Sequence, residues 1–345
     1  MTLHSEIFEQ PVILHNLLAS QFQIVQKIAA EIRAGGVEYI FLAARGTSDN
    51  AGRYANYLWG AFNQLPTALA TPSLFTLYKR PPTLKGALVV GISQSGQSPD
   101  IVSVLAEGKR QGCLTLAITN ASDSPLAESA DFLIDIYAGH EAAVAATKTY
   151  TAELMAIAML AVAFDEKGNN RGDLEAVPGY VEKVLSLDEM IAQVSERYRY
   201  MQQCVVLGRG YNYSTAFEWS LKLKELTYVV AEPYSSADFQ HGPIAMVESG
   251  FPVMAVAPGG MVFDNVFELL ARLKNDYNAE LLVISERSDA LALSHAPVEL
   301  PQGIPEWLTP LVSIVPAQLF AYYLARAKGY STESPRSIHK VTRTR

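Results

Sequence analysis

The sequence predicts an α/β protein made of two tandem, doubly wound parallel-sheet domains related by internal duplication. Short apolar segments alternate with helical patterns of 10–15 residues, which is the pattern of βαβ units. Ala43-Ala-Arg-Gly46 recurs 164 residues later as Leu207-Gly-Arg-Gly210, and residues 87–96 recur at the same spacing as 251–260. The chain of 345 residues, 49% hydrophobic and 18% charged, is long enough and apolar enough for two globular domains.

The first half begins with a helical stretch at 5–34, whose apolar residues share one face and which ends at Gly35-Gly36. A strand at 39–44 then leads through Arg45-Gly-Thr-Ser48 into a helix at 49–62. The other elements expected here are strands at 87–90, 114–119 and 132–136, a helix at 101–110 and an apolar helix ending at 164.

The polar, glycine-containing stretch 165–173 is the best candidate for a domain boundary. We expect beyond it a helix near 174–200, strands at 204–207, 251–256 and 281–284, and an apolar helix at 311–327. The polar tail is expected to fray. The predicted division is a helical arm at 1–34, domains at 35–170 and 171–330, and the tail at 331–345.

Composition excludes several classes of function. A formal net charge of −8 argues against nucleic acid as a partner. The histidines show no metal-ligand spacing, so no metal site is expected, and Cys113 and Cys204 lie in apolar runs typical of core residues in a reduced, cytoplasmic protein. The start of the chain does not resemble a signal peptide, and the longest uncharged apolar run, 154–164, is too short to span a bilayer.

The stretch from Gly91 to Asp100, Gly-Ile-Ser-Gln-Ser-Gly-Gln-Ser-Pro-Asp, forms a polar turn between a strand and a helix. Such a turn directs backbone N–H groups and hydroxyls to one spot at the positive end of a helix dipole, which favours an anion by roughly 0.3–1 kcal/mol before hydrogen bonds are counted. Ser98 and Pro99 suit the N-cap and first helical positions. A tight turn without a ligand remains an alternative, and the second copy has Ala-Pro-Gly in place of Ser-Gln-Ser.

Glu218, Lys222 and Glu225 share one face of a predicted helix, beside an apolar stripe formed by Trp219, Leu223, Leu226 and Val230. The charged trio therefore borders a buried face, although a solvent-exposed ladder of ion pairs is the commoner arrangement. His241 lies in the turn-rich loop 235–243, where a lone histidine is usually just solvated.

Together these residues resemble the sugar-isomerase (SIS) family, in particular the isomerase half of glucosamine-6-phosphate synthases. The most specific matches are Ile92-Ser-Gln-Ser-Gly96, Leu221-Lys-Leu-Lys-Glu225 with His241-Gly-Pro243, and Pro335-Arg-Ser-Ile-His-Lys340. The resemblance implies SIS-type, flavodoxin-like domains, no cofactor, a phosphorylated amino sugar as ligand, and a homodimer with shared active sites.

The resemblance also implies a role for each matching residue. Glu225 matches the carboxylate that moves a proton between C1 and C2, with Lys222 beside it. His241 matches the ring-opening acid/base, which the partner subunit supplies in the family, and Lys340 matches the tail lysine that closes over the sugar. The residues that match sugar-phosphate contacts are Thr47, Ser48, Ser93, Gln94, Ser95, Ser98 and, through its backbone, Val144.

Two departures bear on the activity. The synthases carry a glutaminase domain with an N-terminal cysteine nucleophile, which this sequence does not show, so we do not expect it to take nitrogen from glutamine. Ala146 stands where the synthases have serine, and the ending from His339 resembles stand-alone relatives that deaminate glucosamine 6-phosphate. The expected reaction is conversion of glucosamine 6-phosphate and water to fructose 6-phosphate and ammonia. A fructosamine-6-phosphate deglycase and a non-catalytic sugar-phosphate sensor are the alternatives.

Overall fold

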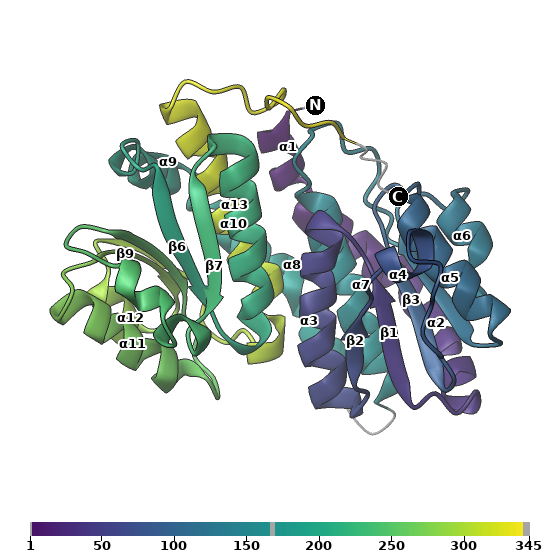
Figure 1. Ribbon diagram of the computed structural model, residues 1–345. Helices are drawn as coiled ribbons and strands as arrows, with labels where there is room; N and C mark the ends of the chain where they lie inside the picture. The colour runs from purple at the N-terminus through teal and green to yellow at the C-terminus, as the bar shows by residue number, and fades with distance from the viewer. Residues whose placement is uncertain (1, 166–169, 341–345) are drawn as a thin grey trace. The chain divides into compact units, whose positions relative to one another are not determined.

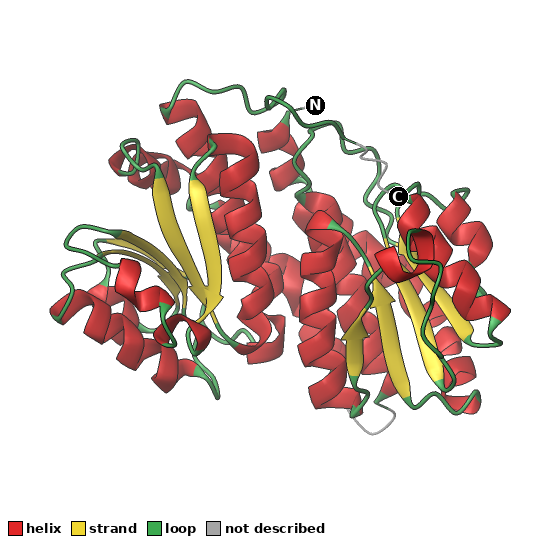
Figure 2. Ribbon diagram, viewed as in Figure 1, coloured by secondary structure: helices red, strands yellow, loops and turns green. Residues whose placement is uncertain are grey.

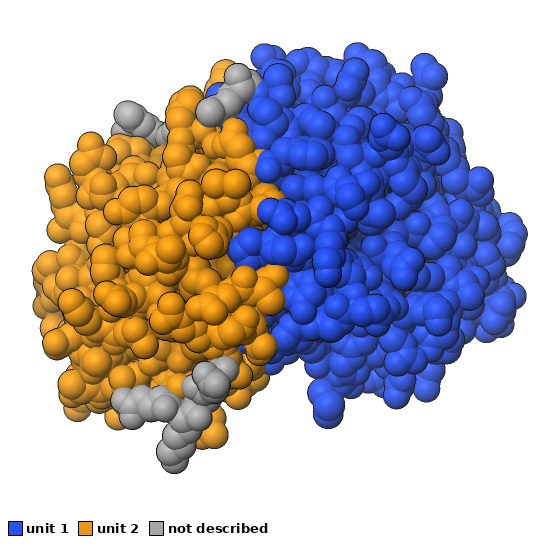
Figure 3. All heavy atoms as spheres, turned by 180° about the vertical axis from the view of Figure 1, so that it is seen from behind, with its two compact units in different colours: residues 1–8, 142–145, 177–338 blue, residues 9–141, 146–176, 339–345 orange. Residues whose placement is uncertain are grey.

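The computed structural model describes residues 2–165 and 170–340 of the chain. These residues fall into two compact units, coloured separately in Figure 3. Unit 1 comprises residues 1–8, 142–145 and 177–338, and unit 2 comprises 9–141, 146–176 and 339–345. The chain therefore passes between the units five times.

Unit 2 is built on a parallel sheet of five strands in the order β2-β1-β3-β4-β5 (Figures 1 and 2). The strands are β1 (Tyr39–Ala43), β2 (Thr67–Leu69), β3 (Ala87–Ile92), β4 (Leu114–Thr119) and β5 (Phe132–Asp135). The helices are α2 (Gln10–Ala34), α3 (Gly46–Asn63), α4 (Ser73–Thr76), α5 (Pro99–Arg110), α6 (Pro125–Ser129) and α7 (Lys148–Phe164).

Helices cover both faces of this sheet, which explains why its central strand is apolar throughout. All six residues of β3 are buried. Phe41 and Val89 pack with residues of α4, α5 and α6, and alternation along the strands turns Leu42 and Val90 to the opposite face, towards α3 and α7. The unit is a doubly wound α/β sandwich, as the sequence predicts.

Unit 1 repeats this topology, with a parallel sheet in the order β10-β9-β8-β6-β7. Its strands are β6 (Gln203–Gly208), β7 (Val230–Ser235), β8 (Pro252–Val256), β9 (Glu280–Ser285) and β10 (Ala296–Glu299). Its helices are α1 (Leu3–Phe8), α9 (Asp188–Arg197), α10 (Tyr213–Thr227), α11 (Phe263–Asn275), α12 (Ser288–Leu293) and α13 (Thr309–Ala327), and α8 (Arg171–Leu185) crosses the unit boundary. Short 3-10 turns are η1 (Gly210–Asn212), η2 (Asp238–Gln240), η3 (Pro243–Met246) and η4 (Glu306–Leu308).

The two sheets confirm the internal duplication. Read from the second strand of each copy, both have the order 2-1-3-4-5. Helices α5 and α11, which follow the third strand of each copy, begin at Pro99 and Phe263. These positions are 164 residues apart, the spacing of the sequence repeat.

Some expected element bounds were wrong. The helix expected at 174–200 is two helices that part at Ser186 and Leu187, and the helix expected at 49–62 already begins at Gly46. Val230 is not on the helix of the charged trio but begins β7, where it is 60% exposed. The outer strands β2, β7 and β10 were missed because they are short or only half buried.

The apolar helix near the end of the chain belongs to the core. The segment Glu306–Ala327 is long and apolar enough to cross a membrane by length and composition, but 94% of its apolar window is buried inside the protein. The tail beyond it is not frayed over residues 331–340, because Glu333, Arg336 and Lys340 all make polar contacts.

Candidate active site

The turn between β3 and α5 has the shape that the anion hypothesis requires. Ser93 leaves the end of β3 buried, and the backbone N–H of Gly96 donates to its Oγ at 3.2 Å. Gly96 has φ +61°, and a Cβ there would lie 2.0 Å from the Oγ of Ser124, so only glycine fits. Ser98 occupies the N-cap position of α5, and within the described residues its side chain makes no capping hydrogen bond. Its hydroxyl is therefore not committed to the helix.

A second turn supplies Thr47 and Ser48. Because β1 pairs with β3 in parallel, the turns that follow these strands lie at the same edge of the sheet. Helix α3 starts right after Arg45, so both residues lie in its first turn. Ser48 is buried, and its Oγ donates to Oε1 of Glu153 at 2.8 Å. We call Thr47, Ser48, Ser93, Gln94, Ser95 and Ser98 the candidate cradle.

Sequence reasoning missed the ion pair that ties these two turns together. The Arg45 side chain, about half exposed, donates through Nε to Oδ2 of Asp100 at 2.8 Å, and Asp100 is fully buried in the first turn of α5. The signal was present, because Arg-Gly recurs at Arg209-Gly210. The pair fixes the β1 turn against the helix whose N-terminus closes the cradle.

The corresponding turn of the second copy is filled by the chain itself. The backbone N–H of Gly259 donates to Oε1 of Glu286 at 2.6 Å, and that of Met261 donates to Oε2 of Glu306 at 2.9 Å. A Cβ at Gly260 would lie 2.2 Å from Cδ of Glu306. Two carboxylates thus take the donors that an anion would need, in agreement with the expectation that only the first copy binds one.

Helix α10 places the charged trio in the interior rather than in a solvated ladder. Glu218 is fully buried, and Lys222 is 1% exposed. The Lys222 Nζ lies 3.2 Å from Oε1 of Glu218 and 2.6 Å from Oε2 of Glu225. Burial alone would lower the pKa of Lys222, but the two carboxylates outweigh it and raise the pKa above its ordinary value. Glu225, with 23% of its side chain exposed, is the member of the trio that solvent or a ligand reaches.

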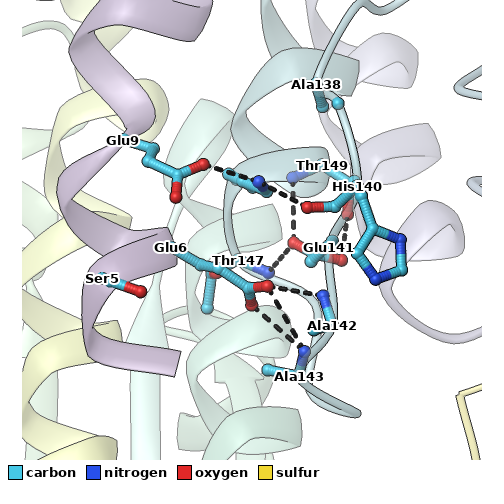
Figure 4. A network of polar contacts seen from close by, with 12 residues as sticks. Ser5, Glu6, Glu9, Ala138, His140, Glu141, Ala142, Ala143, Thr147 and Thr149 are labelled. Carbon is cyan, nitrogen blue, oxygen red and sulfur yellow. Dashed lines mark hydrogen bonds and ion pairs between the residues drawn. The ribbon is translucent and has the colours of Figure 1, made fainter. Parts of the chain in front are cut away.

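Val144 lies in a short loop that a buried carboxylate holds. Glu6, from α1, is fully buried and accepts hydrogen bonds from the backbone N–H groups of Ala142 and Ala143, as Figure 4 shows. All of these residues belong to unit 1. A backbone contact from Val144, as the family resemblance implies, would therefore come from a loop of fixed conformation.

The tail lysine is held by a second buried carboxylate. Glu141 accepts hydrogen bonds from the N–H and Oγ1 of Thr149 and the N–H of Thr147 (Figure 4). Lys340 Nζ completes the set at 2.6 Å from Oε2, and 24% of the lysine side chain is exposed. Sequence reasoning could not find this partner, because 199 residues separate it from Lys340.

His241 lies exposed between η2 and η3, in unit 1. The candidate residues of unit 1 are thus Val144, Lys222, Glu225 and His241, and those of unit 2 are Lys340 and the cradle. Among the described residues no cluster of metal-ligating side chains occurs. The catalytic and binding roles of all these residues stay predictions.

Two duplicated sheets of this topology, with a serine-rich turn in only one of them, define a phosphosugar-isomerase type of protein. The sequence profile of the SIS domain matches residues 37–163 and 200–327, and the chain belongs to that family. It is 34% identical over 343 residues to the glutamine–fructose-6-phosphate aminotransferase (isomerizing) of Aquifex aeolicus, which covers 97% of this chain and 56% of that protein. The chain therefore spans about half the length of this curated relative.

Solved structures agree with this assignment. The C-terminal domain of glucosamine-fructose-6-phosphate aminotransferase from Francisella tularensis superposes with a TM-score of 0.87 at 28% identity, covering 96% of this chain and 98% of that one. A putative phosphosugar isomerase from Silicibacter pomeroyi gives a TM-score of 0.85 at 32% identity, covering 96% and 99%.

Proposed function

We propose that this chain is an isomerising deaminase of amino-sugar phosphates, which converts glucosamine 6-phosphate and water to fructose 6-phosphate and ammonia. The observation that carries the proposal is the buried trio on α10. A carboxylate held by a permanently charged lysine and reachable at one end is what proton transfer between neighbouring carbons needs. The family and the serine-rich cradle support a phosphorylated sugar as the substrate.

The proposed reaction begins with ring opening by His241, which exposes the C1 aldehyde of the 2-amino sugar. Glu225 then takes the proton from C2, and the electron pair forms the C1–C2 double bond of an enolamine. Return of the proton to C1 gives a ketimine at C2. Water adds to C2, and the C–N bond breaks to leave the ketose and ammonia. Lys222 keeps Glu225 oriented through the 2.6 Å contact, and Lys340 covers the open chain.

Glutamine is not expected to be a nitrogen donor for this polypeptide. Its two cysteines are both buried and unpaired with each other, and burial raises the pKa of Cys204 to about 12. A nucleophilic cysteine needs an accessible thiolate. With both thiols in the core, we also propose a cytoplasmic location.

The direct test measures ammonia release and fructose 6-phosphate formation from glucosamine 6-phosphate, with a panel of other amino-sugar phosphates beside it. Glu225→Gln should lose turnover by several orders of magnitude and still bind the sugar phosphate, whereas Glu268→Gln, at an exposed site on α11, should behave as wild type. Binding without ammonia release across the whole panel would favour the sensor. Turnover restricted to fructosamine 6-phosphates would favour the deglycase.

We further propose a homodimer in which His241 acts on the partner's substrate. Mixing inactive Glu225→Gln and His241→Ala chains should then restore activity, because a heterodimer holds one site with both defects and one with neither. If subunits exchange and no activity returns, His241 serves the site of its own chain.

A further inference from the structure

The tail between α13 and Lys340 is attached to unit 1 at two places. After α13 ends at Ala327, Gly329 adopts φ +77° and turns the chain away from the helix axis. The first attachment is Glu333, whose carboxylate accepts the backbone N–H of Leu3 at 3.1 Å. Thr332, next to it, is 8% exposed. This attachment joins the tail to the start of α1.

The second attachment is Tyr228, the residue that follows the helix of the charged trio. The guanidinium of Arg336 lies 3.7 Å above the centre of the Tyr228 ring, and the backbone N–H of Arg336 donates to the Tyr228 hydroxyl at 2.9 Å. The Tyr330 ring packs against the same side chain, with 4.9 Å between ring centres. One tyrosine thus contacts the tail through its ring face, its hydroxyl and a neighbouring ring.

The backbone of Tyr228 gives an independent reason to assign it a role. It ends α10 with φ +57°, a left-handed conformation in which glycine is the usual residue. A helix end alone does not call for an aromatic side chain there. Strained residues of this kind persist where the surroundings need the side chain, most often next to functional sites.

We propose that Tyr228 is the positioning residue of the tail and sets the reach of Lys340 from the end of the helix that carries Glu225. The role assigned to Lys340 rests on the proposed function; the anchoring by Tyr228 does not. Lys340 follows Arg336 by four residues, so its Cα can lie no more than about 14 Å from that of Arg336.

Release of Tyr228 would lengthen this tether in steps. The next attachment, Glu333, is seven residues before Lys340, and the end of α13 at Lys328 is twelve residues before it. Effective concentration falls roughly as the −3/2 power of tether length. Loss of the Tyr228 contacts alone should therefore lower the effective concentration of the lysine about 2-fold, and loss of both attachments about 5-fold.

The experiment compares Tyr228→Leu with Tyr228→Phe, which keeps the ring but not the hydroxyl. The matched control is Tyr277→Leu, because Tyr277 also carries an arginine over its ring and a hydrogen bond from it, far from the tail in sequence. Trypsin cleavage after Arg336, followed by intact mass, reports whether the tail is docked. We expect cleavage about 10-fold faster in Tyr228→Leu, the change that loss of a contact of about 1.4 kcal/mol produces, and an intermediate rate in Tyr228→Phe.

Turnover provides the second readout. In Tyr228→Leu, kcat should fall about 2-fold, and about 5-fold when Glu333→Ala is added, while KM and inhibition by inorganic phosphate stay unchanged. If Tyr228→Leu does not fold, Arg336→Gln leaves α10 intact and is assayed by cleavage after Lys340. Cleavage no faster than in Tyr277→Leu, or a freed tail with unchanged kcat, overturns the proposal. A wild-type chain without turnover contradicts the proposed function, and the trypsin comparison then decides on the anchor alone.

Discussion

Lys222 offers the sharpest test of the buried trio. Lys222→Met keeps the length of the side chain and removes the ammonium that lies 3.2 Å from the fully buried Glu218. Loss of one partner of a buried ion pair costs about 3–5 kcal/mol, because an uncompensated charge remains. We expect the variant to lose this much stability at pH 8 in urea denaturation. Arg171→Met, which breaks the exposed Arg171–Glu175 pair at 2.9 Å, should cost no more than about 1 kcal/mol.

The pH dependence identifies the cause. Without Lys222, burial should raise the folded-state pKa of Glu218 above its unfolded value, so the folded variant binds the extra proton. Its deficit should then shrink by up to about 1.4 kcal/mol for each unit of acidification from pH 8 towards pH 5. Adding Glu218→Gln should remove both this slope and most of the deficit. A deficit below about 1 kcal/mol at pH 8, or the same pH slope with Gln at position 218, would refute the reasoning.

Three further predictions concern other parts of the chain. Ser95→Ala should weaken binding of the sugar phosphate and of inorganic phosphate by about 1.5–3 kcal/mol in calorimetric titration, whereas Ser103→Ala, whose hydroxyl bonds only its own helix at Pro99, should not; equal affinities would remove the cradle assignment. Both thiols should resist a maleimide in the native protein at pH 8 and react after denaturation; because the pKa of Cys204 is raised to about 12 from 9.0, stability should also fall as pH rises between these values, and fast native labelling would contradict the burial. Glu306→Ala should destabilise the protein by about 1–3 kcal/mol without changing inhibition by phosphate, and altered inhibition would mean that the second copy also binds the anion.

The sequence was sufficient to predict the sheets and the turn after β3, because strand, turn and helix signals there are local. The duplicated Arg-Gly and the spacing of 164 residues predicted two units of one topology. The bounds that failed depended on backbone conformations without a local signal. Tyr228 ends α10 at φ +57° although no glycine or proline marks the place, so Val230 looked like part of the helix.

The burial of the charged trio could not be decided from the sequence. Spacing of i, i+4 and i+7 suits an exposed ladder and a buried network equally well. The outcome depends on α13, which packs against α10 from about ninety residues further along the chain. Glu6 and Glu141 were missed for the same reason, since each meets its partners only once distant segments have folded together.

The repeated passage of the chain between units has a consequence for dividing the protein. The short segments 1–8 and 142–145 belong to unit 1, although most of the sequence around them belongs to unit 2, and the tail contributes to both. A fragment that stops at the repeat boundary would carry Glu6 and its two amide partners without the rest of their unit, and it would lack Lys340 for Glu141. We therefore expect neither half to be produced alone as a stable protein, and the two to recover structure only when co-expressed. Duplication supplied two similar modules, and exchange of these segments has since made each depend on the other.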